Sequence, residues 1–265
     1  MNRFLGPQPE LAIRQVRDRE PEWFKLAESV ASYAGDLIYQ LRVPRGEQRL
    51  LLGAVLYRRV ASAFEAVIML TERGMHTEGL AARRSMLEVL FVLGAICNQA
   101  ELVDTYLKND EHRRRDIYKN IKKMSPTIRK SLTPELTPEV VDKHISELTA
   151  STKGSTYMGV EQYAQAAKLH DIYLNDYSFL SEAAHHVARD LERQIAVDSD
   201  GDVNGFYWGP DPDLPSALLS PAVEHMLMAA RATEALFKIG PSERLGSLWR
   251  KAEEMFEQHA GTQDS

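Results

Sequence analysis

The sequence predicts an all-α protein: a multi-helix antiparallel bundle around one buried central helix, with one small β-hairpin near residues 195–208. Two observations support this fold class. Apolar residues recur every three or four positions along most of the chain, which is the spacing of one helix face. Residues 79–98 (GLAARRSMLEVLFVLGAICN) are apolar on nearly every side from Met86 onward. A helix of this kind must be covered, and its apolar part is shorter than the roughly 20 residues that span a membrane, so other helices are expected to cover it.

Composition narrows the class of protein further. The chain has 265 residues, 44% of them hydrophobic, which suits one large helical domain. A net charge of −6 argues against a uniformly basic nucleic-acid binder. The single cysteine, Cys97, excludes a disulfide framework, and its apolar surroundings indicate a small buried side chain rather than a nucleophile. The N-terminus lacks the apolar segment of a signal peptide, so we expect a cytoplasmic protein without a membrane segment.

The first half of the chain is expected to form an N-terminal arm and a helical hairpin. Prolines interrupt residues 1–20, the predicted arm, and Pro21 is well placed to begin the first helix of a bundle domain spanning residues 21–240. Helices are predicted over 21–41, 47–73 and 79–98. Gly74 is a typical residue after a helix C-terminus, so the last two of these helices should run antiparallel.

The chain becomes charged after residue 98. A short helix is predicted over 100–108, followed by a basic and polar helical excursion over 109–159. Residues 108–130 hold nine basic and three acidic side chains, a net charge of +6. Thr133-Pro134-Glu135 and Thr137-Pro138-Glu139 each supply an N-cap, a proline at the first helical position and an acid in the first turn, so both predict a helix start. Residues 151–159 are predicted to form a polar loop.

The last third of the chain predicts further helices and the hairpin. A strong helical pattern covers 160–192, with a break near His170, and the hairpin lies within a turn-rich stretch. One helix is then expected from Pro221 to Ile239. A C-terminal unit, 241–265, should consist of a helix from Ser242 to about His259 and a disordered tail.

Two charges interrupt the central helix and predict a polar site. Arg84 and Glu88 are four residues apart and share a face with apolar positions, where an unpaired charge costs several kcal/mol. On the later helix, Ser181 and His185 lie on the border between the polar and the apolar side. Pairing the two helices would bring Arg84, Glu88, Ser181 and His185 together, whereas the simpler interpretation is a solvated helix face.

These residues carry a resemblance to a known family. The pattern runs through Arg58, Phe64, Gly74 and Arg84-Ser85-Met86-Leu87-Glu88, and continues with Tyr173, Tyr177-Ser178, Leu180-Ser181 and His185. It resembles the bacterial domain-of-unknown-function 5677 family, over roughly residues 45–240. That family has an Arg-Ser-x-x-Glu helix after a helical hairpin and a later Tyr-x-x-Leu-Ser-x-x-x-His helix. The resemblance implies the helical fold and the four polar positions, and it implies no reaction.

Three classes of function remain open at this point. The first is an interaction module, favoured because no complete catalytic motif is present. The second is a metal-independent ribonuclease like the HEPN enzymes of toxin and defence systems, with His185 as the acid or base and Arg84 holding the phosphodiester. HEPN motifs place an arginine a few residues before the histidine, whereas here Arg189 follows His185.

The third class is a carboxylate-bridged metal protein. Glu182 and His185 have the Glu-x-x-His spacing of di-iron bundles, and Glu65 and Glu88 lie on neighbouring helices. A second Glu-x-x-His is missing, so no metal ligand and no cofactor is predicted.

The basic segment is the predicted partner surface. Its charge suits RNA or an acidic protein, although only Tyr118 could stack on a base. The sequence is also compatible with a homodimer. The candidate nucleic-acid contacts are Arg113, Arg114, Arg115, Lys119, Lys122 and Lys123.

Overall fold

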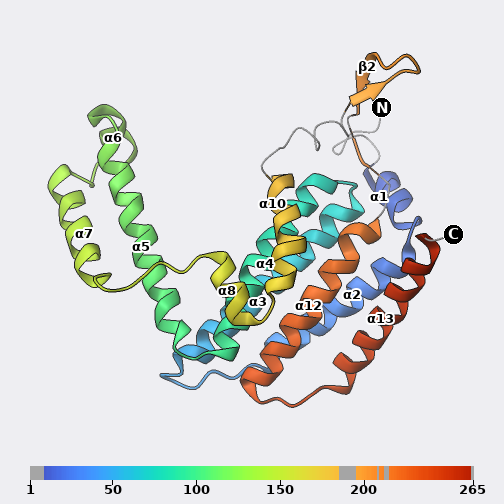
Figure 1. The fold of residues 1–265 in the computed structure, drawn as a ribbon, viewed down its shortest axis with the longest axis horizontal. Helices are drawn as coiled ribbons and strands as arrows, with labels where there is room; N and C mark the ends of the chain where they lie inside the picture. Colours follow the sequence, from blue (N-terminus) through green and yellow to red (C-terminus); the bar gives the residue numbers. More distant parts are fainter. Residues whose placement is uncertain (1–8, 185–194, 208, 212–214, 264–265) are drawn as a thin grey trace.

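Helix α4 (His76–Asn98) runs through the middle of the molecule, as predicted (Figure 1). The computed structural model describes residues 9–184, 195–207, 209–211 and 215–263. Helices α3 (Gln48–Glu72), α8 (Val160–Ala167), α10 (Ser178–Ala184) and α12 (Pro215–Phe237) all pack against α4. Met86, Leu87, Leu90, Phe91 and Leu93 are fully buried there. The all-α class and the central helix are therefore confirmed.

A glycine closes the hairpin between α3 and α4. Gly74 has φ +65°, and its amide bonds the carbonyl of Thr71 at 2.9 Å while the amide of Met75 bonds that of Leu70 at 2.9 Å. These two bonds satisfy carbonyls that the end of a helix leaves free. The carbonyl of Gly74 in turn accepts a bond from the amide of Asp211 at 3.0 Å. The turn thus anchors the segment that leads into α12.

Helices α2 (Pro21–Gln40) and α13 (Glu243–Gln263) complete the bundle next to α12, and the predicted N-terminal arm contains a helix. This helix, α1 (Pro9–Arg17), buries Val16 against the core, and Arg17 forms ion pairs with Glu28 and, at 3.0 Å, with Glu72. The two prolines of this stretch predicted an irregular arm. Pro9 stands at the first helical position, however, where a proline is tolerated.

Helices α5 (Leu102–Lys123), α6 (Pro126–Leu132) and α7 (Pro138–Ser151) stand away from the bundle (Figure 1). We call them the projection. The short helix predicted over 100–108 is wrong, because α5 continues for its full 22 residues. The helix start at Thr133 is also wrong: α6 begins earlier, where the Ser125 hydroxyl accepts a bond from the Ile128 amide at 3.3 Å. The start at Thr137 is confirmed by the same kind of bond to Val140.

The helical stretch after residue 160 is interrupted near His170, as predicted. Lys168 takes a left-handed conformation with φ +61° and ends α8. The chain then forms α9 (His170–Ile172), a π-helix η1 (Tyr173–Tyr177) and α10. Short π-helices inside helical segments often accompany functional sites. This one supplies two consecutive side chains to the polar site described below.

The remaining elements follow the predicted order. Strands β1 (Ile195–Val197) and β2 (Val203–Phe206) form the predicted antiparallel hairpin. Helix α12 begins six residues before the predicted start and contains Pro221 in its interior. Helix α13 begins after Ser242, whose hydroxyl accepts a bond from the Leu245 amide at 3.3 Å, and extends to Gln263, beyond the predicted end. Within the described residues, no helix is both long and apolar enough to cross a membrane.

The Gly74 turn predicts a difference between two glycine substitutions. Gly46 and Gly74 both have positive φ, but a Cβ on Gly74 would lie 2.6 Å from the Asp211 nitrogen, whereas nothing lies within 4 Å of one on Gly46. Gly46→Ala should cost about 1–2 kcal/mol for the left-handed backbone alone. Gly74→Ala should lower the free energy of unfolding by roughly 3 kcal/mol or more, because backbone must also move. Urea denaturation followed by circular dichroism measures both, and equal losses would contradict the contact with Asp211.

Candidate functional site

The predicted pair Arg84 and Glu88 forms a polar edge on α4 together with a tyrosine. Their side chains lie 3.3 Å apart and are 27% and 39% exposed. The hydroxyl of Tyr177, from η1, donates to Glu88 at 2.8 Å and accepts from Arg84 at 3.2 Å. The guanidinium of Arg84 also lies 5.4 Å from the centre of the Tyr177 ring. The predicted charge pairing is present, but the pair is half-exposed and not buried.

The buried arginine of α4 is the preceding residue, Arg83, whose side chain is 5% exposed. It forms an ion pair with Asp176 and donates to the carbonyl of Ala217 at 3.1 Å. In a regular helix the amide of residue 221 would bond that carbonyl, but Pro221 has no N–H. The proline inside α12 therefore leaves the Ala217 carbonyl free for Arg83.

Burial weakens both charges of this pair. It lowers the pKa of Arg83 and raises the pKa of Asp176, although each partner opposes the shift of the other. These directions are those of a pair in which desolvation exceeds the mutual attraction. Within the described residues the Nε of Arg83 has no hydrogen-bond partner. Burial of this pair therefore costs free energy, which the contacts of Arg83 with Asp176 and with the Ala217 carbonyl offset.

His225 completes the buried side of the site. Its Nε2 lies 3.5 Å from Asp176, and burial, with a further contribution from Arg83, lowers its pKa to about 3. The imidazole is therefore neutral at physiological pH. On the same helix, burial and the proximity of Asp176 raise the pKa of Glu224. Because His225 is enclosed, it does not offer a proton to an outside group.

The π-helix explains how the two arginines find their partners. Consecutive residues of η1, Asp176 and Tyr177, contact consecutive residues of α4, Arg83 and Arg84. Asp176 points to the buried arginine and Tyr177 to the half-exposed one. We call Arg83, Arg84, Glu88, Asp176, Tyr177 and His225 the arginine clasp.

Aromatic rings extend the exposed side of the clasp. The ring of Tyr177 stacks on Tyr173 with centroids 5.2 Å apart, and Tyr173 stacks on His170 at 5.9 Å. Phe91 meets both tyrosines edge-on from the core side. Burial raises the pKa of Tyr177, so its hydroxyl keeps its proton near neutral pH.

The projection comes within electrostatic reach of the clasp near the middle of α5. Arg113, on α5, donates from Nε and Nη2 to the hydroxyl of Tyr157 at 3.1 and 3.0 Å. This bonding raises the pKa of Arg113, and the carboxylate of Glu88 contributes to the shift. Glu88 therefore lies within electrostatic reach of one of the basic residues that the sequence singled out.

The other two predicted site residues have different outcomes. Ser181, half-buried on α10, makes no hydrogen bond to Arg84 or Glu88 within the described part of the chain. His185 lies outside the described residues, as does the side chain of Glu182. Among described residues no three His, Cys, Asp or Glu side chains are close enough to hold a metal ion.

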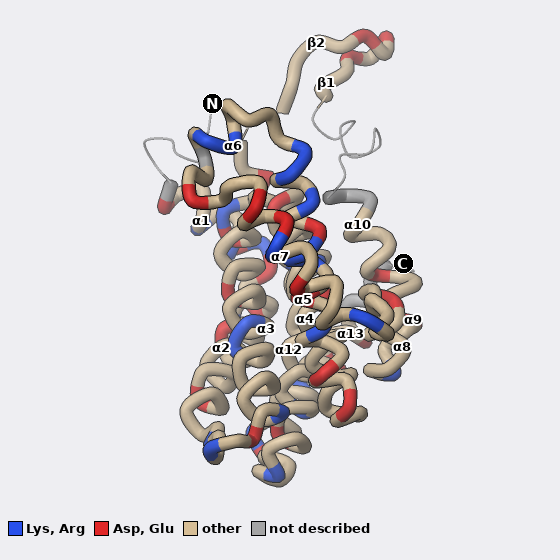
Figure 2. Tube along the Cα trace, turned by 90° about the vertical axis from the view of Figure 1, so that its left-hand side faces the viewer, with Lys and Arg blue, Asp and Glu red and all other residues tan. Residues whose placement is uncertain are grey.

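Most of the predicted nucleic-acid contacts are engaged within the projection. Arg115 donates to Thr152 at 3.1 Å, Lys119 pairs with Asp116 at 3.1 Å, and Lys122 pairs with Asp142 at 2.6 Å. Arg113 binds Tyr157 as described above. Arg114 and Lys123 are exposed. Figure 2 shows the basic positions of this region interleaved with acidic ones.

Sequence reasoning missed Arg83, Asp176 and His225. A signal for Arg83 was available, because it precedes Met86, Leu87 and Leu90 by three, four and seven residues and so lies in the middle of the apolar face. Asp176 and His225 gave no comparable signal. Their burial depends on the π-turn and on the early start of α12.

A family model, described as a family of unknown function (DUF5677), matches residues 50–202. The match covers more than half of the chain, so the chain belongs to this family, and the resemblance found in the sequence motifs is confirmed. No curated protein and no solved structure matches the chain.

The clasp predicts unequal effects for two neighbouring arginines. Arg83→Ala leaves Asp176 buried without its partner and should lower the free energy of unfolding by about 3–5 kcal/mol. Arg84→Ala removes a half-exposed pair and should cost about 1 kcal/mol or less. Both variants replace an arginine of α4 with alanine, so their free energies of unfolding, measured by chemical denaturation, can be compared directly. Equal losses would show that Arg83 is not the buried anchor.

His225 predicts a pH dependence of stability. In the unfolded chain the imidazole gains a proton near pH 6.5, whereas in the folded protein it stays neutral down to about pH 3. The unfolded state therefore binds more protons in this window, and folding stability falls as the pH falls. Relative to His225→Gln, the wild type should lose about 2 kcal/mol between pH 6.5 and 5.

Denaturation curves at both pH values test this dependence. Asp176 and Glu224 have raised pKa values and act in the opposite direction, but both remain in the variant, so the comparison isolates His225. Parallel pH profiles for the two proteins would contradict a neutral, buried imidazole.

Proposed function

We propose that this DUF5677 member is an interaction module that binds an acidic protein surface through its projection. The observation that carries the proposal is the free side of α5 and its continuation, where exposed cations and exposed aliphatic side chains occur together. Ile117 is 57% exposed, Met124 38% and Ile128 52%. Arg114 and Lys123 are exposed on the same segment, nine residues apart, so they lie on the two flanks of the aliphatic face. A protein partner would cover the aliphatic groups and pair with the cations.

Helix geometry separates this side from the side that packs on α7. Arg113, Ile117 and Met124 follow one another at intervals of four and seven residues, so they line one face. The opposite face holds Tyr118, which stacks on His144 of α7 with centroids 4.7 Å apart, and Lys122, which pairs with Asp142. Ile117 and Met124 therefore face away from α7, whereas Arg113 on the same face is bonded to Tyr157.

The same contacts argue against RNA as the partner. Bases stack on accessible aromatic rings, but Tyr118 is already stacked on His144. Acidic residues neutralise Lys119 and Lys122, which reduces the charge available for phosphates. Exposed isoleucine and methionine side chains contribute nothing to phosphate binding, whereas they are typical of protein contacts.

A photo-crosslinking experiment tests the partner. A photoreactive phenylalanine analogue replaces Ile117, and a control protein carries it in place of Leu51, which is 55% exposed on α3. In cells of the source organism, Ile117 should give a discrete protein adduct that Leu51 does not. The double variant Arg114→Glu and Lys123→Glu should lose the adduct. The purified partner should bind this double variant at least tenfold more weakly than it binds the wild-type protein.

A matched control carries the same charge change elsewhere. Arg58→Glu and Arg59→Glu alter two exposed arginines of α3 and should leave the adduct in place. Adducts of equal yield at both crosslinking positions would contradict the proposal. An adduct with RNA at Ile117 would instead assign the projection to nucleic-acid binding.

A ribonuclease is the second candidate, and the observation that favours it is the half-exposed guanidinium of Arg84, with Arg113 within electrostatic reach of the neighbouring Glu88. The predicted acid or base, His185, lies outside the described residues. Purified protein is incubated with total RNA in EDTA, alongside Arg84→Ala and His185→Ala. Cleavage that falls by roughly 10²–10⁴-fold in His185→Ala would establish the enzyme and displace the interaction module. Intact RNA throughout would remove the second candidate.

A further inference from the structure

A cavity of about 320 Å³ lies along the C-terminal half of α4, from Leu90 to Asn98. Helices α3, α4, α8 and α12 and the turn after α8 contribute to its wall. The volume lies at the lower end of the range of small-molecule sites, which begins near 300 Å³. None of the contacts of the clasp or of the projection involves this wall.

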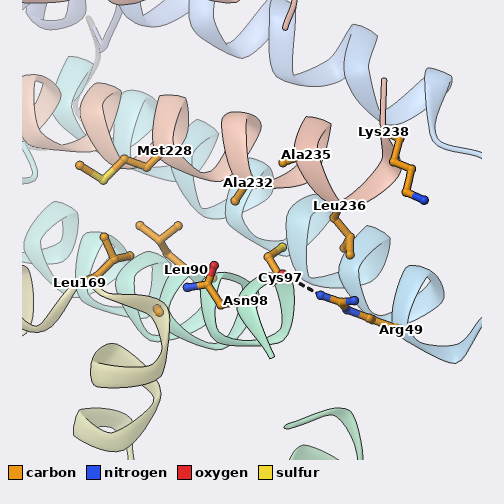
Figure 3. Close-up of a pocket in the computed structure, with 12 residues that line it drawn as sticks. Arg49, Leu90, Cys97, Asn98, Leu169, Met228, Ala232, Ala235, Leu236 and Lys238 are labelled. Carbon is orange, nitrogen blue, oxygen red and sulfur yellow. Dashed lines mark hydrogen bonds between the residues drawn. The ribbon is translucent and has the colours of Figure 1, made fainter. Parts of the chain in front are cut away.

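The wall has an apolar end and a cationic end (Figure 3). Leu90, Leu169 and Met228 lie together at one end, where the amide of Asn98 lies beside Leu90, and Arg49 and Lys238 lie at the other. Small side chains, among them Ala232 and Ala235, and the thiol of Cys97 lie between them. A ligand that fits both ends has an apolar body and a polar head.

The charges of the wall indicate which charge the polar head of such a ligand carries. Among the described residues no acidic side chain lines the cavity, although Asp and Glu outnumber Lys and Arg in the chain by 38 to 32. Arg49 donates from Nε to the carbonyl of Ile96 at 3.0 Å and from Nη2 to that of Cys97 at 2.7 Å. These bonds hold the guanidinium at the mouth, and within the described residues its Nη1 and the Nζ of Lys238 have no hydrogen-bond partner.

Helix termini account for only part of this arrangement. A cation near a helix C-terminus is favourable, and Arg49 meets this need for α4 through its two bonds to terminal carbonyls. Lys238 follows the end of α12 but makes no such bond among the described residues. An anion between the two cations would give Lys238 a partner and would bind the free edge of Arg49.

We infer that this cavity is a binding site for a small aliphatic carboxylate, whose head lies between Arg49 and Lys238 and whose chain extends toward Leu90, Leu169 and Met228. The part of the wall that the structure describes contains no aromatic side chain, so a flexible chain suits it better than a ring. Octanoate serves as the probe, and octanol is its neutral counterpart.

Cys97 provides a direct reporter, because it is the single cysteine of the chain and lines the cavity. Burial raises the pKa of its thiol to about 11, so the thiol is neutral and reacts slowly with alkylating reagents at neutral pH. A ligand in the cavity should slow the reaction further. The rate of modification by N-ethylmaleimide, followed by intact mass, measures occupancy without any assumption about activity.

Octanoate, used below its micellar concentration, should protect Cys97 at concentrations at least tenfold lower than octanol. Lys238→Glu should weaken protection by octanoate at least tenfold and leave protection by octanol unchanged. Arg59→Glu, an equal charge change on the exposed face of α3, should alter neither. Ala232→Phe, which fills the cavity from α12, should abolish protection by both, with an unchanged circular dichroism spectrum showing that the variant folds.

Three results would overturn the inference. Protection of Cys97 by benzoate at lower concentrations than octanoate requires would reject the aliphatic class. Equal protection by octanoate and octanol would reject the role of the two cations. Absence of protection by octanoate in the wild-type protein would reject the site itself.

Discussion

The buried ion pair between Arg83 and Asp176 is the contact on which the polar face of this protein depends. It joins α4, η1 and α12, which are distant in the sequence. A guanidinium removed from water must have its donors satisfied, and two of them are met by the Asp176 carboxylate and the Ala217 carbonyl. That carbonyl is free because Pro221 cannot bond it. A proline that would ordinarily weaken a helix therefore supplies an acceptor that the core requires.

The same pair positions the half-exposed edge of the clasp. Asp176 fixes η1 against α4, and the next residue, Tyr177, then reaches Arg84 and Glu88. The buried pair therefore positions the edge, whose own ion pair is of the exposed kind that contributes little to stability. Arg84 and Glu88 are partly exposed, and Arg113 of α5 lies within electrostatic reach of Glu88, while the buried half of the clasp positions η1 behind them.

Helix α4 carries two candidate sites on one rigid element. The clasp residues of α4 span Arg83 to Glu88, and the C-terminal half of the same helix contributes Leu90, Gly94, Cys97 and Asn98 to the cavity wall. The two differ in chemistry: the clasp edge carries half-exposed charges, whereas the cavity is a half-open, mainly apolar space with Arg49 and Lys238 at one end. Each can therefore be tested without disturbing the other.

Local patterns predicted the elements whose cause is local. The Gly74 turn, the start at Thr137, the break near His170 and the hairpin near 195–208 all follow from side chains acting on their own backbone. Predictions failed where a local start was overlooked, as at Ser125-Pro126, and where a distant contact decides. The projection is one long helix and two short ones because α5 finds α7 as a partner, and α12 begins early because the core accommodates the helix around Pro221.

The sequence by itself determined the all-α class, the central helix, the family and the i,i+4 pairing of Arg84 with Glu88, because helical periodicity and motif spacing are properties of neighbouring residues. Only the tertiary structure decided which arginine is buried. Arg83 and Arg84 are chemically identical neighbours, and a rotation of about 100° between them places one against Asp176 and the other at the surface. That choice is made by the elements that pack on α4, and their arrangement is set by contacts between segments far apart in the chain.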